Sequence, residues 1–112
     1  MDTLPVITKT YEVYKNLLEL NCHLEKCYRY GLGSSLENSL LSLLQELIMA
    51  KNAPKALKAG YLIRACSQQE IAILKLRVYL ELELANQTKI FQLQSLLIEI
   101  GKMAGGWLKS LS

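Results

Sequence analysis

Residues 55–85 read KALKAGYLIRACSQQEIAILKLRVYLELELA and place apolar side chains on two sides of a helix. At 100° per residue, one row consists of Leu62, Cys66, Ile73, Leu76, Leu80 and Leu84, and a second row on roughly the opposite side consists of Leu57, Ile71, Leu74, Val78 and Leu82. One apolar row is enough to pack a helix into a bundle. A helix with two rows has to be covered on both sides, so this segment predicts a helical bundle that associates with itself.

Three further amphipathic helices are predicted, at about 4–22, 34–51 and 88–110, in addition to the helix at 55–85. Their expected apolar faces are Ile7, Tyr11, Tyr14 and Leu18 in the first, Leu36, Leu40, Leu43, Leu44, Leu47 and Ile48 in the second, and Ile90, Leu93, Leu97, Ile100, Ala104, Trp107 and Leu111 in the last. At 112 residues we expect one domain, 1–112. Its fold is predicted as all-α, an antiparallel up-down-up-down four-helix bundle that oligomerises into a ring or barrel.

The connections between these helices carry helix-breaking residues. Pro54 separates the second and third helices, and residues 86–88 separate the third and fourth, with Asn86 expected as a left-handed C-cap and Thr88 as the next N-cap. Residues 21–33 have mixed polarity and end in YRYGLG. Because glycine disfavours a helix interior by roughly 1 kcal/mol relative to alanine, this segment predicts either a loop or an irregular helix start.

Glycines also interrupt the last helix. Gly101 and Gly105 lie one turn apart, which predicts close approach of a neighbouring helix or chain, with a frayed C-terminal turn as the alternative. We predict that these two glycines form an oligomer interface together with part of the first apolar row of residues 55–85. That interface consists of Leu62, Ile73, Leu80, Leu84, Gly101 and Gly105.

Several classes of protein are disfavoured by the sequence. The chain has no run of 18 apolar residues, and its N-terminus lacks a basic segment followed by an apolar one, so we expect neither a membrane span nor a signal peptide. Three cysteines without metal-ligand spacing suit free thiols in a reducing, cytoplasmic compartment. Catalytic motifs are missing as well, so we predict no enzyme activity, no cofactor, no metal and no small-molecule substrate.

The distribution of charge along the chain says more about possible binding partners than the missing motifs do. The net charge is only +3, but residues 51–77 carry six lysines and arginines against a single acidic residue, Glu70. Arg64 and Lys75 lie eleven residues apart and share one face of the predicted helix, with Gln68 between them. Such a face suits contact with phosphates, although an ordinary solvated face is the alternative. A symmetric oligomer would multiply this positive charge.

Four short motifs, in order, carry a resemblance to a known family. They are PVITKTY at 5–11, YRYGLG at 28–33, ENSLL at 37–41 and EIGKMAGGWLKS at 99–110. Together they resemble the four-helix-bundle family that contains the accessory variability determinant (Avd) proteins of diversity-generating retroelements and the proteins encoded in 23S rRNA intervening sequences. The Tyr-Arg-Tyr element and the Gly-Gly-Trp-Leu-Lys-Ser ending are more similar to the Avd branch.

The resemblance implies a homopentameric, basic barrel of four-helix protomers that binds a reverse transcriptase and its template RNA or cDNA. In that role the protein is a non-catalytic accessory factor of mutagenic cDNA synthesis. Arg29 matches the arginine of the Tyr-Arg-Tyr element, Arg64 and Lys75 fall in the basic third helix, and Lys109 follows the terminal tryptophan. The predicted nucleic-acid-binding set is Arg29, Lys58, Arg64, Lys75, Arg77 and Lys109.

Alternatives remain open for the roles of Arg29, Tyr28 and Tyr30 and for the function of the protein. Arg29 is equally suited to a structural pair with Glu37, and Tyr28 and Tyr30 suit packing as well as base stacking. The chain is less basic than a dedicated RNA-binding protein, which favours contact with the polymerase. Two other functions fit the same fold: an rRNA-intervening-sequence protein of unknown role, and a structural helical oligomer without nucleic acid.

Overall fold

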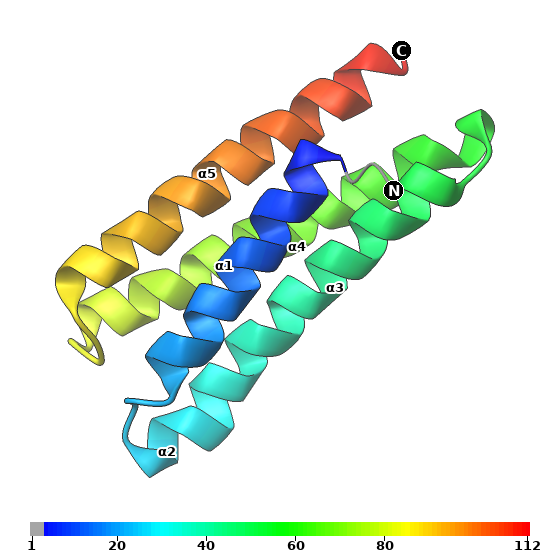
Figure 1. The fold of residues 1–112 in the computed structure, drawn as a ribbon. Coiled ribbons are helices and arrows are strands. Elements are labelled where there is room, and N and C mark those ends of the chain that lie inside the picture. Colours follow the sequence, from blue (N-terminus) through cyan, green and yellow to red (C-terminus); the bar gives the residue numbers. More distant parts are fainter. Residues whose placement is uncertain (1–3) are drawn as a thin grey trace.

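The computed structural model describes residues 4–112, and they form a bundle of four long helices (Figure 1). The long helices are α1 (Pro5–Asn21), α3 (Ser34–Asn52), α4 (Lys55–Glu81) and α5 (Gln87–Ser110), and two short elements, α2 (Lys26–Tyr28) and the π-helix η1 (Arg29–Gly33), lead into α3. Consecutive long helices run antiparallel, so the predicted up-down-up-down bundle is confirmed for the protomer. None of the helices described is long and apolar enough to cross a membrane.

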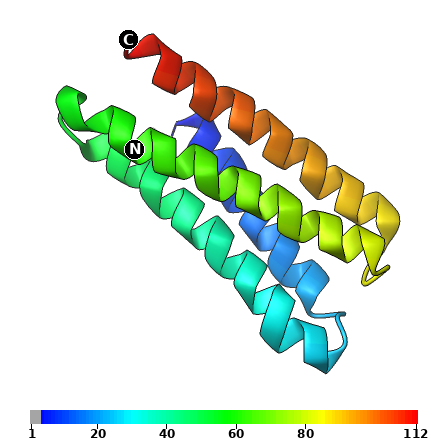
Figure 2. The ribbon, with the colours of Figure 1, turned by 180° about the vertical axis from the view of Figure 1, so that it is seen from behind.

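The four long helices occupy the corners of a square. Helix α1 packs against α3 and α5, and α4 packs against the same two helices, so α1 and α4 stand at opposite corners. The two views agree, because α1 lies in front in Figure 1 and α4 lies in front in Figure 2. The bundle therefore has four side faces, which are named below by the two helices that flank them.

Three of the four predicted core faces are largely confirmed. In α5, Ile90, Leu93, Leu97, Ile100 and Ala104 are all buried, as the spacing of three and four predicts. In α3 the predicted leucines at 36, 40, 43 and 47 are buried, whereas Ile48 is exposed. In α4 the first row lies on the core side, but its centre is shifted toward Ala65, Ala72 and Tyr79. Small alanines there allow α4 to approach its neighbours closely.

The predicted face of the first helix is wrong in part. The predicted Ile7 is buried and the predicted Tyr14 packs against the core, but most of the core side of α1 is formed by Val6, Val13, Leu17 and Leu20. Thr10 is also buried, and its hydroxyl donates to the Val6 carbonyl at 2.7 Å. Tyr11 is 51% exposed and Leu18 37%. Thr10 fits the core because a threonine hydroxyl can bond the carbonyl one turn earlier, a possibility that a count of apolar residues misses.

The connections also differ from the predictions. Residues 26–33 form the irregular helix start rather than a loop, and they run directly into α3. The third helix ends at Glu81, four residues before the predicted end, and the left-handed residue is Glu83 (φ 53°) rather than Asn86. Asn86 is instead the N-cap of α5, where its side chain accepts from the backbone N–H of Lys89 at 3.0 Å, the role predicted for Thr88.

A buried polar cluster holds three helices together at one end of the bundle. Tyr79 of α4 donates its hydroxyl hydrogen to Asn21 Oδ1 at 2.7 Å, and Asn21 Nδ2 donates to the Gly33 carbonyl at 3.1 Å and to Glu37 Oε2 at 2.8 Å. A Cβ on Gly33 would stand 3.3 Å from Asn21 Nδ2, so the glycine admits this approach. Asn21, which is buried, thus links α1, the π-helix, α3 and α4.

A second polar contact explains Gly101. Gln69 of α4 is buried and donates from Nε2 to the Leu97 carbonyl of α5 at 2.8 Å. A Cβ on Gly101 would lie 2.7 Å from that same nitrogen, closer than atoms can approach. The predicted close approach therefore occurs, but within one chain, and Gly101 is corrected from an oligomer-interface residue to a packing residue. A Cβ on Gly105 would meet nothing within 4 Å.

We expect alanine substitutions at these two glycines to have opposite effects on stability. Gly105→Ala should raise the free energy of unfolding by about 0.5–1 kcal/mol, because it removes the helix penalty of glycine without a clash. Gly101→Ala should lower it by about 1 kcal/mol, because an unpaired buried Gln69 amide costs about 1–3 kcal/mol, more than the helix gains. Urea unfolding of both variants tests the contrast; stabilisation by Gly101→Ala would contradict the packing role.

Candidate nucleic-acid interface

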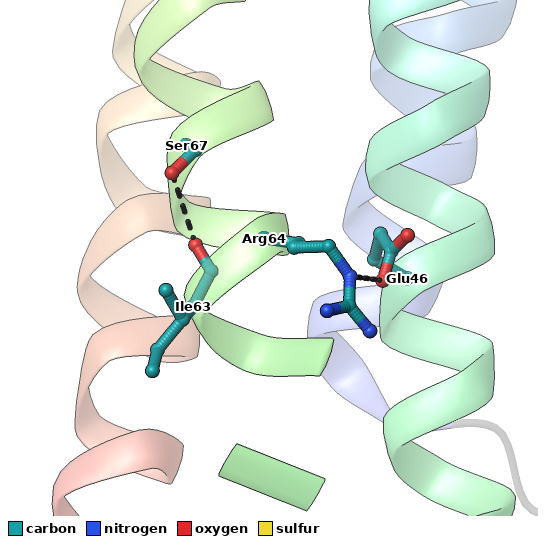
Figure 3. A network of polar contacts seen from close by, with 4 residues as sticks. All are labelled: Glu46, Ile63, Arg64 and Ser67. Atoms are coloured by element: carbon teal, nitrogen blue, oxygen red, sulfur yellow. Dashed lines mark hydrogen bonds and ion pairs between the residues drawn. The ribbon is translucent and has the colours of Figure 1, made fainter. Parts of the chain in front are cut away.

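Arg64 is the most exposed basic contact between α3 and α4 (Figure 3). Its Nε donates to Glu46 Oε2 across the helix boundary at 3.1 Å, and its guanidinium carbon lies 4.8 Å from the centre of the Tyr61 ring. The side chain is 57% exposed, and its hydrogen bond to Glu46 uses Nε rather than either terminal nitrogen. An arginine held in this way presents a forked pair of donors suited to a phosphate.

Lys75 lies on the same side of α4, but its ammonium group is hydrogen-bonded to α3. Its Nζ donates to the Ser39 hydroxyl at 2.7 Å and to the Ser35 carbonyl at 3.1 Å. Because Arg64 and Lys75 both contact α3, the prediction that they share a face is confirmed. However, Lys75 fastens α3 to α4, so a substitution there would test helix packing as much as ligand binding.

An open groove runs beside these residues along the α3/α4 face. It is lined by Gly31, Ser34, Ser35, Asn38, Ser39, Ser42, Gln68, Ile71 and Lys75. Hydroxyl, amide and ammonium groups dominate this lining, and it contains no carboxylate. The groove was not predicted, because its serines come from α3 and its cation from α4. The repeated serines and asparagine of residues 34–42 are the signal in the sequence that could have pointed to it.

Lys58 and Arg29 are likewise held by backbone carbonyls. Lys58 Nζ donates to the Ala50 and Lys51 carbonyls at 2.7 and 3.0 Å, so it satisfies the C-terminal end of α3. Arg29 donates from one terminal nitrogen to the Cys22 and Leu24 carbonyls at 3.0 and 3.1 Å, which fastens the turn after α1. The alternative pair of Arg29 with Glu37 does not form, since Glu37 accepts from Asn21.

The remaining predicted cations are accessible. Arg77 forms a long contact of 3.6 Å with Glu81 on the same helix and is 66% exposed, and Lys109 is exposed in the last turn of α5. Tyr30 is 68% exposed, whereas Tyr28 packs partly against the core. Of the six predicted residues, Arg64, Arg77 and Lys109 are thus exposed, the two arginines each beside a carboxylate, whereas Arg29, Lys58 and Lys75 are bonded to carbonyl or hydroxyl groups of the fold.

The predicted oligomer interface needs correction as well. Leu62 is 0% exposed and belongs to the core of the protomer, so it has no surface left for a second copy. Ile73, Leu80 and Leu84 are half-buried and pack against that core. Of the two predicted interface glycines, only Gly105 has open space beside it, since a Cβ there would have no heavy atom within 4 Å. The first row of α4 is therefore the inner row.

The second row of α4 is the one that faces solvent. We define the α4 outer row as the exposed side chains of Ile63, Ile71, Leu74, Val78 and Leu82, whose exposed fractions range from 36% to 57%. Ile63 and Leu74 are eleven residues apart, as are Ile71 and Leu82, so each pair is nearly aligned along the helix, and the two pairs lie about 80° apart around it. Withdrawing five half-exposed side chains of this size from water would contribute on the order of 5 kcal/mol.

The buried Tyr79 makes stability depend on alkaline pH. Its burial raises the pKa of Tyr79 to about 12 from 10.0, an effect that the Asn21 hydrogen bond partly reverses and the Glu37 carboxylate enhances. Since the folded pKa exceeds the unfolded one, the stability from the neutral phenol is complete below pH 10 and is lost as the pH rises towards 12.

We therefore expect the free energy of unfolding to fall by up to about 1.4 kcal/mol per pH unit across that interval. Tyr79→Phe removes this contribution and should give a flatter profile in urea unfolding over the same pH range. Equal slopes for the two proteins would contradict the assignment to Tyr79.

Other chemical groups are dispersed. Within residues 4–112, no three His, Cys, Asp or Glu side chains gather as ligands of a metal would. All three cysteines are free thiols; Cys22 and Cys27 are exposed, whereas burial and the nearby Glu70 carboxylate raise the pKa of the half-buried Cys66.

No known protein-family model matches the chain, and no curated protein matches it. The likeness to the Avd family thus rests on the four motifs and on the predicted fold.

Proposed function

We propose that the protein is a non-catalytic accessory factor of a diversity-generating retroelement that binds the reverse transcriptase and its template RNA. The proposal combines the family resemblance with the surface of one protomer. Three of the four motifs lie at structurally defined places: YRYGLG forms the π-helix start of α3, ENSLL contributes Glu37 to the polar cluster, and EIGKMAGGWLKS contains the Gly101 contact.

One observation carries the nucleic-acid part of this proposal. Arg64, exposed and paired with Glu46, precedes Gln68 by one turn of α4, and Gln68 lines a groove that has serine hydroxyls, side-chain amides and an ammonium group but no carboxylate. Hydroxyl and amide groups bond phosphate and sugar oxygens, and arginine supplies the charge. The groove follows α3 and α4 along the bundle, so an extended strand of RNA can run along it.

The modest positive charge of one protomer limits how strongly it can hold RNA. Its net charge is +3, and among the predicted binding residues the exposed Arg64 and Arg77 each lie beside a carboxylate, so with Lys109 they provide few phosphate contacts. In a symmetric oligomer such as a pentamer each copy adds the same contacts, so the total attraction rises with the number of copies. The oligomer then acts as a scaffold that brings RNA to the polymerase, which performs the chemistry.

A salt-titrated binding assay with a fluorescently labelled RNA tests this function. Wild-type affinity should fall steeply with salt, and Arg64→Gln should weaken binding about tenfold and reduce the salt slope by about one per engaged protomer. Lys89→Gln is the matched control, because it removes one charge from the N-terminal turn of α5, beside the groove between α1 and α5. We expect that control to bind within about twofold of wild type.

Two results would reject parts of the proposal. Equal losses in Arg64→Gln and Lys89→Gln would mean that net charge rather than the α3/α4 face attracts RNA. Affinity that does not respond to salt, or no binding at all, would favour a structural oligomer without nucleic acid. A neighbouring reverse-transcriptase gene with a template repeat is expected; an rRNA operon around the gene would instead favour the intervening-sequence branch.

A further inference from the structure

A cavity of about 530 Å³ opens between α1 and α5, on the face of the bundle opposite the α3/α4 groove. Its deepest residues are Leu20 and Leu93, which are buried, and Leu96, which is half-buried. The polar side chains around them come from both helices: Asn16 and Glu19 of α1, and Lys89, Gln92 and Ser95 of α5. Sites for small molecules typically have volumes of roughly 300–1,000 Å³ and an apolar lining with a few polar groups. We call this site the α1/α5 cavity.

An ion pair between α1 and α5 fixes which wall residues stand level with each other. Lys9 of α1 bonds Glu99 of α5 at 2.8 Å. Because these two helices run antiparallel (Figure 1), the residue ten positions after Lys9 lies level with the residue ten positions before Glu99. Those residues are Glu19 and Lys89, and both line the cavity. A carboxylate and an ammonium group therefore flank the same end of the cavity from opposite walls.

Glu19 and Lys89 are not bonded to each other. Within residues 4–112, neither side chain forms an ion pair or a hydrogen bond. By contrast, Arg64 and Lys75 at the α3/α4 boundary are both bonded to α3. Two unlike charges that stand level without pairing can hold one ligand between them, provided that the ligand brings a group of opposite charge to each.

The ends of the two helices favour the same orientation of such a ligand. Helix α1 ends at Asn21, two residues after Glu19, and α5 begins at Gln87, two residues before Lys89. A helix carries partial negative charge at its C-terminus and partial positive charge at its N-terminus. The α1 wall therefore attracts a cationic group and the α5 wall an anionic one, through the backbone as well as through the side chains.

We propose that the α1/α5 cavity binds a free α-amino acid with a long apolar side chain. An α-amino acid carries its ammonium and carboxylate groups on one carbon, which suits two unlike charges at one level, whereas a dipeptide carries its charges at opposite ends. The apolar side chain then lies along the cavity against Leu93 and Leu96. A purely anionic amphiphile would be repelled by Glu19 and a purely cationic one by Lys89. The ligand is held and not transformed, and the proposed function does not depend on it.

Four forms of phenylalanine test the proposal in a titration followed by NMR of the isotope-labelled protein. They are the zwitterionic amino acid, cationic phenylalaninamide, anionic N-acetylphenylalanine and neutral N-acetylphenylalaninamide. Phenylalanine should shift the amide signals of Leu93 and Leu96. It should bind about fivefold more tightly than either singly charged form, because each of those lacks one charge contact.

Charge variants should abolish this preference selectively. Lys89→Gln should bind phenylalanine and phenylalaninamide about equally, because the site for the carboxylate is lost. Glu19→Gln should bind phenylalanine and N-acetylphenylalanine about equally, because the site for the ammonium group is lost. Lys102→Gln and Glu70→Gln are the matched controls, since they remove the same charges from exposed helix positions outside the cavity, and both should keep the wild-type order.

Several results would overturn the proposal. Tightest binding of the neutral form would mean that the cavity takes an internal peptide segment, and no shift with any form would mean that the cavity is not a site. An unchanged preference in both Lys89→Gln and Glu19→Gln would place the ligand elsewhere. Loss of the preference in the control variants would assign it to net charge. RNA affinity is measured separately, so failure of the proposed function would leave these results intact.

Discussion

Replacing Asn21 by alanine is expected to lower the free energy of unfolding by about 3 kcal/mol, equivalent to a fall of roughly 12 °C in Tm. The side chain is buried, and it accepts from Tyr79 while donating to the Gly33 carbonyl and to Glu37. Its removal leaves the buried Tyr79 hydroxyl and the Gly33 carbonyl without their partner, where unmade hydrogen bonds are expensive, and takes one donor from the half-buried Glu37 carboxylate.

A double-mutant cycle shows whether the cluster acts as a unit. Tyr79→Phe alone should cost about 1–2 kcal/mol, because it leaves Asn21 Oδ1 unpaired, and the double variant should cost little more than Asn21→Ala. Asn16→Ala, an exposed position on the same helix, is the matched control and should change stability by less than about 0.5 kcal/mol. Additive losses in the double variant would contradict a direct bond between Asn21 and Tyr79.

Leu62→Ala and Leu74→Ala, two identical truncations on one helix, should separate stability from assembly. Leu62 is fully buried, so its truncation should cost about 3 kcal/mol in chemical unfolding. Leu74 is 57% exposed in the protomer, so its truncation should cost the monomer less than about 0.5 kcal/mol while weakening self-association. Unfolding is followed at one fixed protein concentration and association by sedimentation.

The opposite pattern would restore the interface first predicted from the sequence. If Leu62→Ala abolished association without destabilising the fold, the inner and outer rows of α4 would have to be exchanged. The pair is informative because both substitutions remove the same atoms from the same helix. Only the side of α4 on which they lie differs.

The polar contacts explain why half of the predicted basic set serves the fold. Lysine and arginine reach far along a helix surface, so a cation close to a neighbouring helix finds carbonyl or hydroxyl acceptors there. Lys58 reaches the end of α3, Lys75 reaches Ser39, and Arg29 reaches the turn after α1. Arg64 also meets α3, but its hydrogen bond to Glu46 uses Nε alone and its side chain is 57% exposed. A role for Arg64, Arg77 and Lys109 in RNA binding stays a prediction.

The sequence pattern alone predicted the features that depend only on residues close together in the chain. Helix periodicity in the primary structure identified four helices and the core face of α5, and Pro54 marked the break before α4. It also established that α4 has two apolar rows, since the angle between side chains on a helix depends only on their separation in the chain. The expectation of self-association came from those two rows alone.

The tertiary structure alone decided which row faces the core and what the glycines and lysines contact. Both rows of α4 are apolar, and only the positions of α3 and α5 select Leu62 for the interior and leave Leu74 exposed. The same holds for Gly101, whose contact is Gln69, 32 positions earlier in the chain. Such choices depend on distances between segments remote in sequence, and a periodic pattern contains no information about those distances.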